Sequence, residues 1–178
     1  MSLVMKVDNK KILSKRKHIR LKDFDYNSAG AYFITICTES RRCILSHVVG
    51  TGVLDGPHVE LTQNGKVAEK YIKQLNDFYN NISIESYVVM PNHIHVLMLV
   101  YENGPSRTPV PTVQNSIVSR FVSTFKRFCN KEYGKNIWQY RSNDHIIRNR
   151  EDYMQHLRYI YENPARWYFD ELYAEDKL

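Results

Sequence analysis

The stretch Ile82–Val100, which reads ISIESYVVMPNHIHVLMLV, decides the fold of this chain. Its two halves, residues 82–90 and 94–100, are rich in β-branched and other apolar side chains, and this composition favours strands. Pro91 and Asn92 between them are residues typical of turns. The stretch therefore predicts two antiparallel strands in the core of the protein.

Further elements follow on both sides of this pair. Some segments carry apolar residues at intervals of three or four, which predicts amphipathic helices, and others are aromatic or β-branched, which predicts strands. Gly134 is expected to end the second helix and Asn149 to begin the third. In chain order, we expect a strand at 31–38, a hairpin or loop at 43–64, a helix at 62–79, strands at 82–90 and 94–100, an exposed loop at 102–112, a helix at 113–133, a strand within 137–147 and a helix at 150–163. This order indicates an α+β fold in which helices pack on one antiparallel sheet.

The composition indicates a single folded domain. The chain has 178 residues, of which 43% are hydrophobic and 25% are charged, and this balance excludes wholesale disorder. No stretch approaches the roughly 18 uncharged apolar residues that a membrane span needs, and the N-terminus lacks the apolar region of a signal peptide. The cysteines are three, an odd number, which disfavours a disulfide framework. We therefore expect a cytoplasmic protein with reduced thiols and no membrane partner.

Positive charge is concentrated in two blocks of a chain whose formal net charge is +6. Residues 1–22 hold eight Lys and Arg against one acidic residue, and a second block runs from Arg120 to Arg150. Such blocks either contact a phosphate backbone or form a solvated arm and a solvated helix face. The sequence accordingly divides into a basic N-terminal arm at 1–22 and a single domain at 23–178.

His93 and His95 are the residues that most clearly suggest chemistry. Side chains two positions apart on a strand point to the same face, here with Cα atoms roughly 6.6–7 Å apart. Two imidazoles at that separation can bind one divalent metal ion, and a catalytic metal site then needs a further ligand from elsewhere. The alternative is a pair of histidines satisfied by hydrogen bonds on a half-buried strand.

The helix expected at 150–163 carries a second candidate. With 100° per residue its apolar side chains form one stripe, and Tyr159 lies on the opposite face. Asn163 is one turn after Tyr159, so the two side chains are neighbours. A tyrosine hydroxyl assisted by a metal can act as a nucleophile, whereas the alternative is a surface tyrosine whose ring lies on a nearby loop. The apolar stripe consists of Tyr153, Met154, Leu157, Ile160 and Tyr161. The rival tyrosines are Tyr87, Tyr101, Tyr140, Tyr153 and Tyr161.

Several motifs together resemble the HUH-type single-tyrosine transposases, and within them the REP-associated tyrosine transposase branch. The two most specific motifs are Met-Pro-Asn-His-x-His at 90–95 and Tyr-Ile-x-x-Asn-Pro at 159–164. The resemblance covers most of the chain, and it departs from the branch at Ser142, where an aromatic residue is usual. This departure is expected to alter local packing or a DNA contact. Weaker resemblances lie at Arg16–Leu21, Asp25-Tyr26, Gly30–Thr38, Phe125-Lys126, Trp138-Gln139, His145–Arg148, Trp167 and Asp170.

This resemblance implies a ferredoxin-like (RRM-type) sheet and a DNA-cleaving activity. His93 and His95 would hold Mg²⁺ or Mn²⁺, with Asn163 as the third ligand. Tyr159 would attack a phosphate of single-stranded DNA next to a hairpin, leaving a 5′-phosphotyrosine link and a free 3′-OH. The protein would act at the bacterial nucleoid, as a monomer or a homodimer. Contacts with backbone phosphates are expected from Arg16, Lys17, Arg20, Arg120, Lys126 and Arg148.

Two other functions are compatible with the residues. A non-catalytic nucleic-acid-binding module of the same fold would stack bases on aromatic side chains such as Tyr32, Phe33 and Tyr87. A metal-dependent hydrolase would use water as its nucleophile and would leave no covalent adduct. The coincidence of the two histidines with Tyr159 favours the transposase, because binding alone does not require it.

Overall fold

A computed structural model describes residues 28–50, 56–102 and 116–174 of the chain. The basic arm expected at 1–22, with its three predicted phosphate contacts Arg16, Lys17 and Arg20, lies outside the described residues, as does most of the loop expected at 102–112. None of the described helices has the length and apolar character needed to cross a membrane.

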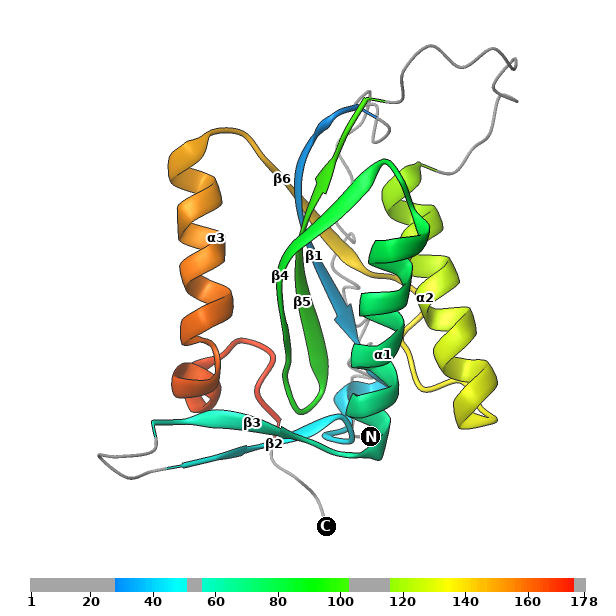
Figure 1. Ribbon diagram of the computed structural model, residues 1–178. Coiled ribbons are helices and arrows are strands. Elements are labelled where there is room, and N and C mark those ends of the chain that lie inside the picture. Colours follow the sequence, from blue (N-terminus) through cyan, green and yellow to red (C-terminus); the bar gives the residue numbers. More distant parts are fainter. Residues whose placement is uncertain (1–27, 51–55, 103–115, 175–178) are drawn as a thin grey trace, which may run out of the picture.

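Four strands form a central antiparallel sheet in the order β4–β5–β1–β6 (Figure 1). Helix α1 connects β1 to β4 and helix α2 connects β5 to β6, so these elements follow the β-α-β-β-α-β order of a ferredoxin-like fold. The α+β prediction and the antiparallel pair in 82–100 are confirmed. The bounds are β1 Gly30–Cys37, α1 Gln63–Phe78, β4 Ile82–Val89, β5 His93–Val100, α2 Ile117–Tyr133 and β6 Asn143–Ile147.

A two-stranded ribbon is inserted between β1 and α1. It consists of β2 (Ser46–Val49) and β3 (His58–Leu61), which pair antiparallel, as the expected hairpin in 43–64 requires. After α3 (Arg150–Glu162) the chain forms a short 3-10 helix, η2 (Pro164–Phe169), which contacts β3. The ribbon therefore closes the end of the sheet near the C-terminal segment (Figure 1).

The sheet separates two apolar layers. Helices α1 and α2 pack on one face, while α3 and η2 cover the other (Figure 1). Successive side chains of β5 alternate between them: Ile94 and Val96 enter the layer under α1 and α2, and Leu97 enters the layer under α3. His93 and His95 have the parity of Leu97, so the alternation directs both imidazoles to the side of α3.

Local signals fix where the helices begin and end. The Thr62 side chain caps α1 by accepting a hydrogen bond from the Gly65 backbone N–H (3.2 Å). A Cβ atom at Gly65 would collide with the carbonyl oxygen of Leu45, so this turn of α1 needs glycine. Gly134 adopts a left-handed conformation (φ 69°) and ends α2, and the Asn149 side chain caps α3, both as predicted.

Helix α3 is rotated relative to the prediction. Met154 and Tyr161 of the expected apolar stripe are 47% and 86% exposed, whereas the ring of Tyr159 is half-buried and contacts Phe33 of β1. The prediction that Tyr159 faces away from the packed side of the helix is wrong. The physical reason is that the face of α3 that packs on the sheet carries polar as well as apolar side chains. The pattern of hydrophobic residues alone therefore does not identify this face.

The aromatic residues proposed to stack bases are covered. Tyr32 is fully buried under α1 and α2, and its hydroxyl donates to the Ser28 carbonyl (2.8 Å). Phe33 is 8% exposed under α3, and the Tyr87 hydroxyl donates to a Glu69 carboxylate oxygen (2.9 Å). Base stacking on Tyr32 is therefore contradicted, and Phe33, between β1 and α3, offers only a narrow edge to solvent.

Candidate active site

The two histidines of β5 lie side by side under α3. Their ring centroids are 4.5 Å apart, and His93 and His95 are 0% and 3% exposed. In the register of the sheet, Thr35 of β1 lies opposite His95. The prediction that both imidazoles share one face of the sheet is confirmed, and the pair is more deeply buried than a half-buried strand implies.

Hydrogen bonds orient each imidazole through Nδ1. The His93 Nδ1 donates to Asn92 Oδ1 (2.8 Å), because the Asn92 Nδ2 group is itself donating to the Leu172 carbonyl oxygen (2.8 Å). The His95 Nδ1 lies 3.0 Å from Thr35 Oγ1. Each Nε2 is buried and has no hydrogen-bond partner among the residues that the structure describes. Outer partners that hold one ring nitrogen so that the other can ligate are typical of metal-binding histidines.

Burial keeps both histidines neutral at pH 7. Loss of solvent lowers the pKa of His93 to about 4, even though the Asp170 carboxylate opposes this shift. Burial also lowers the pKa of His95 well below its usual value, and the neighbouring His93 lowers it further. A neutral imidazole offers a lone pair to a cation, whereas a protonated one does not.

Asp170, directly after η2, connects the histidines to α3. Its Oδ2 accepts hydrogen bonds from the Tyr159 hydroxyl (2.8 Å) and from Asn163 Nδ2 (3.0 Å). One ligand atom each from Asp170, His93 and His95 lies within 4.8 Å of the others. Within the described ranges of the chain, the buried Asn163 Oδ1 has no hydrogen-bond partner. The Nε2 atoms of His93 and His95, the amide oxygen of Asn163 and the carboxylate of Asp170 form a set of ligand atoms that fits a divalent cation.

Among the candidate tyrosines, Tyr159 is the one whose ring contacts the histidine pair. Its ring centroid is 5.2 Å from that of His95. Burial raises the pKa of its hydroxyl, and the hydrogen bond to Asp170 raises that pKa further. Of the rival tyrosines, Tyr140 and Tyr161 are 95% and 86% exposed and Tyr101 is 48% exposed. Tyr87 pairs with Glu69 and Tyr153 with Glu85.

A cavity of about 540 Å³ opens beside these residues. It is lined from β1, β5, α3 and the segment that leads into β6. His95, Tyr159 and Asp170 contribute to its wall, and so does Ser142, the position at which the sequence departs from the branch. The basic residues that reach it are Arg41 and Arg141. A cavity with two guanidinium groups beside Tyr159 and the histidine pair suits a phosphodiester.

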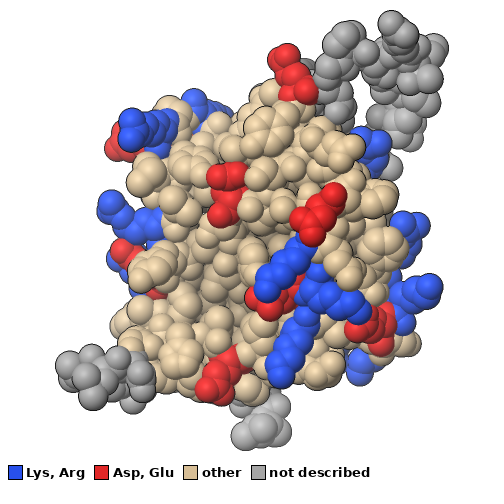
Figure 2. Space-filling view, in the orientation of Figure 1, with Lys and Arg blue, Asp and Glu red and all other residues tan. Residues whose placement is uncertain are grey.

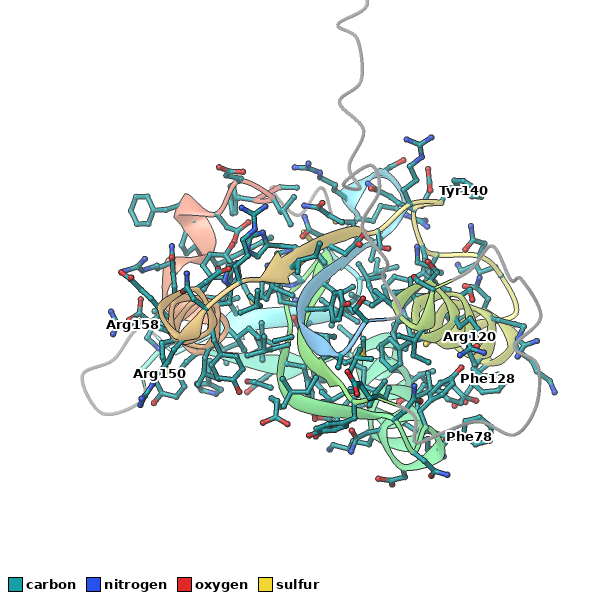
Figure 3. All side chains as sticks on the ribbon, turned by 90° about the horizontal axis from the view of Figure 1, so that it is seen from above. Phe78, Arg120, Phe128, Tyr140, Arg150 and Arg158 are labelled. Carbon is teal, nitrogen blue, oxygen red and sulfur yellow. The ribbon has the colours of Figure 1, made fainter. Side chains whose placement is uncertain are left out.

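The residues of the second basic block, Arg120 to Arg150, do not share one surface. Arg120 on α2 and Arg150 on α3 lie on opposite sides of the molecule, with the sheet between them (Figure 3). On the face in Figure 2, Lys and Arg alternate with Asp and Glu. Arg120 and Arg148 are exposed, and neither lines the cavity. The second basic block is therefore split by the fold.

The ammonium group of Lys126 is hydrogen-bonded to the backbone of the protein. Its Nζ donates to the carbonyl oxygens of Gln139 (2.8 Å) and Tyr140 (3.3 Å), and burial lowers its pKa to about 8. This placement speaks against the phosphate contact predicted for Lys126, because the ammonium group already holds the segment that enters the cavity wall.

Several residues of the site were not assigned a role from the sequence. Asp170 lies beyond the predicted helix in a segment without periodicity, and its only signal is its place after the Asn163-Pro164 motif. Asn92 was assigned to the turn and to the motif at 90–95, without the role of orienting His93. Arg41 lies beyond the end of β1, which is Cys37, and no sequence signal assigned it to the site.

Comparisons with known proteins agree with this geometry. No family model matches the chain. A Haemophilus influenzae protein, named only as uncharacterized, is 30% identical over 175 residues, which span 90% of this chain and 94% of that protein. The REP-associated tyrosine transposase of Escherichia coli K12 is 29% identical over 141 residues, which span 79% of this chain and 70% of the transposase.

A solved structure has the same fold. It is a REP-associated tyrosine transposase bound to a REP hairpin, with a TM-score of 0.58 and 25% identity over 83% of this chain and 74% of its own. This chain belongs to the REP-associated tyrosine transposases. In this transposase the motifs at 90–95 and 159–164, which are far apart in sequence, meet on the α3 side of the sheet.

Proposed function

We propose that this transposase cleaves and rejoins single-stranded DNA next to a hairpin, and that Tyr159 is the nucleophile that forms a 5′-phosphotyrosine link. The observation that carries the proposal is the hydrogen bond from the Tyr159 hydroxyl to Asp170, whose carboxylate also lies within 4.8 Å of the ligand atoms of both histidines. A hairpin substrate is supported by the solved relative, which is bound to a REP hairpin. A DNA substrate implies action at the nucleoid.

The metal-binding set would hold Mg²⁺ or Mn²⁺ through His93, His95, Asp170 and Asn163. When bound, a divalent ion there would stabilise negative charge on the phosphoryl oxygens. Arg41 and Arg141 would hold the phosphate in the cavity, and the buried site would exclude water that competes with Tyr159.

The bond changes start at the Tyr159 hydroxyl. Asp170 accepts its proton along the existing hydrogen bond, and the phenolate oxygen forms a bond to phosphorus. The bond from phosphorus to the 3′-oxygen of the preceding nucleotide breaks. In rejoining, the free 3′-OH attacks the phosphotyrosine, and Tyr159 recovers its proton. No external energy source is needed, because one phosphoester is exchanged for another.

The test is capture of DNA by the wild type and by Tyr159→Phe. The proteins are incubated with single-stranded hairpin DNA from the gene's own flanks and Mg²⁺ or Mn²⁺, and adducts are resolved on denaturing gels. The wild type is expected to form an adduct, and the variant none, because phenylalanine has no oxygen to attack phosphorus. The variant should lose only about 1 kcal/mol of stability, since Asp170 keeps the hydrogen bond from Asn163.

The control is Tyr161→Phe, an exposed tyrosine of the same helix, which should behave as the wild type. An adduct in Tyr159→Phe would assign the nucleophile to another tyrosine. Cleaved DNA without any adduct in the wild type would indicate a hydrolase that uses water. Binding without any cleavage would indicate a non-catalytic copy.

A further inference from the structure

A second cluster of ionisable side chains lies at the first turns of α3. His156 Nδ1 is 2.9 Å from the Asp152 backbone oxygen and 3.0 Å from Asp152 Oδ1. Both partners are acceptors, so Nδ1 carries the hydrogen and donates it. Over the described part of the chain, no hydrogen bond involves His156 Nε2. The imidazole is therefore oriented by one nitrogen and free at the other.

The Asp152 carboxylate, which binds this imidazole, is itself held by further hydrogen bonds. It also accepts from His145 Nε2 (3.0 Å) and from the Arg148 backbone N–H (3.0 Å). Although partial burial raises its pKa, these hydrogen bonds lower it overall. Asp152 therefore stays ionised at neutral pH, and its carboxylate accepts hydrogen bonds from both imidazoles.

His156 lies in the wall of the same cavity as Tyr159. The ring of Phe33 links it to the metal-binding histidines: its centroid is 4.5 Å from His156, 4.9 Å from His95 and 6.0 Å from Tyr159. Because Phe33 has no polar atom, it fixes these distances without taking part in proton transfer. A phosphodiester held between Tyr159 and His95 would have His156 at its edge.

We propose that His156, positioned by Asp152, is the catalytic acid that protonates the departing 3′-oxygen. This inference rests on the proposed function. As the bond between phosphorus and the 3′-oxygen breaks, the oxygen takes its electron pair and the proton of His156 Nε2, while Asp170 takes the proton of Tyr159. In rejoining, neutral His156 accepts the proton of the attacking 3′-OH and protonated Asp170 returns one to Tyr159, so protons balance in both directions.

The charged and titratable groups that surround His156 come from several elements. On α3 they are Asp152 and Tyr159, and from β6 His145 stacks on the imidazole with centroids 4.7 Å apart. Around the cavity the remaining groups are His95, Cys37, Arg41, Arg141, Asp170 and Glu171. Asp152 is the one of these with a direct hydrogen bond to His156 among the residues described.

The experiment compares two DNA substrates that differ in one atom. Both are the cleavable hairpin DNA, and in one of them sulfur replaces the 3′-oxygen that leaves. A thiolate leaves without a proton, because thiols are far more acidic than alcohols. Rates of adduct formation are measured in Mn²⁺ for the wild type, His156→Ala, His156→Gln and Asp152→Asn. Circular dichroism and DNA affinity establish that each variant is folded and binds.

On ordinary DNA, His156→Ala and His156→Gln are expected to form the adduct ~100-fold or more slowly than the wild type, as for loss of a general acid. On the sulfur substrate, their rates should lie within about threefold of the wild-type rate. Asp152→Asn should show the same pattern more weakly, since it acts through His156. The control is His58→Gln, which removes an exposed histidine outside the cavity lining and should keep the ordinary rate.

Equal losses on both substrates would overturn the acid role and assign His156 to structure, as would an unchanged rate on ordinary DNA. A wild type that forms no adduct with either substrate would overturn the proposed function and this inference with it. A wild type that forms the adduct while the His156 variants match it on both substrates would overturn this inference alone.

Discussion

At the scale of single residues, burial of His93 and His95 makes the metal-free protein sensitive to acid. The pKa of His93 falls from its usual 6.5 to about 4 on folding, so between these pH values the unfolded chain binds more protons than the folded one. The free energy of unfolding should therefore fall as the pH drops from 6.5 toward 4, and between pH 7 and pH 5 the loss should be roughly 2 kcal/mol. Urea denaturation at pH 7 and pH 5, with a chelator present, measures this difference in the free energy of unfolding.

The control for this prediction is His58→Gln, which removes an exposed histidine outside the site and should keep the pH dependence. The double variant His93→Gln and His95→Gln should lose much of it. An equal stability of the wild type at pH 7 and pH 5 would contradict the neutral, buried pair.

At the scale of elements, α1 depends on close contact between its first turn and the loop before β2. Gly65→Ala places a methyl group against the Leu45 carbonyl oxygen, which is backbone and also accepts a hydrogen bond from the Thr62 N–H (3.0 Å). The expected loss is about 2 kcal/mol or more, measured by urea denaturation. Lys66→Ala, at an exposed position of the same turn, should change stability by less than about 0.5 kcal/mol. Equal effects of the two substitutions would refute the contact.

The elements themselves follow from local patterns in the sequence. The strands at 82–100, the caps at Gly134 and Asn149 and both long helices depend on periodicity and turn chemistry, which act over a few residues. The rotation of α3 could not be predicted in this way, since polar side chains, among them His156 and Tyr159, lie on the face of α3 that packs toward the sheet. The contact of Asp170 with Tyr159 is likewise tertiary, because the chain must fold back through η2 to make it.

At the scale of the whole molecule, one chain supplies every part of the site. Tyr159, Asp170, His93 and His95 meet within a single subunit. A mixture of the His95→Ala and Tyr159→Phe variants should therefore form no more adduct than either variant alone. Restored adduct in the mixture would mean that two subunits exchange α3, and would favour a homodimer as the active form.

Binding of DNA by the whole chain should depend on the basic arm at 1–22. Removing it is expected to weaken binding to all sequences and to flatten the plot of log affinity against log salt, because fewer counterions are released. A full-length variant with the Lys and Arg of the arm replaced by Gln should match the truncation. An unchanged slope would exclude the arm from phosphate contacts.

The packing of α3 divides the site into two halves of different local stability. His93 and His95 belong to the central strand, so their imidazoles separate only when the sheet itself unfolds. Ile160 is the one buried side chain of α3, every residue of which the structure describes, and Trp167 of η2 adds a second anchor. Segments with few buried side chains open at lower free energy than the core. Backbone amides of α3 should consequently exchange with solvent sooner than those of β5, and Tyr159 can withdraw from a histidine pair that stays assembled.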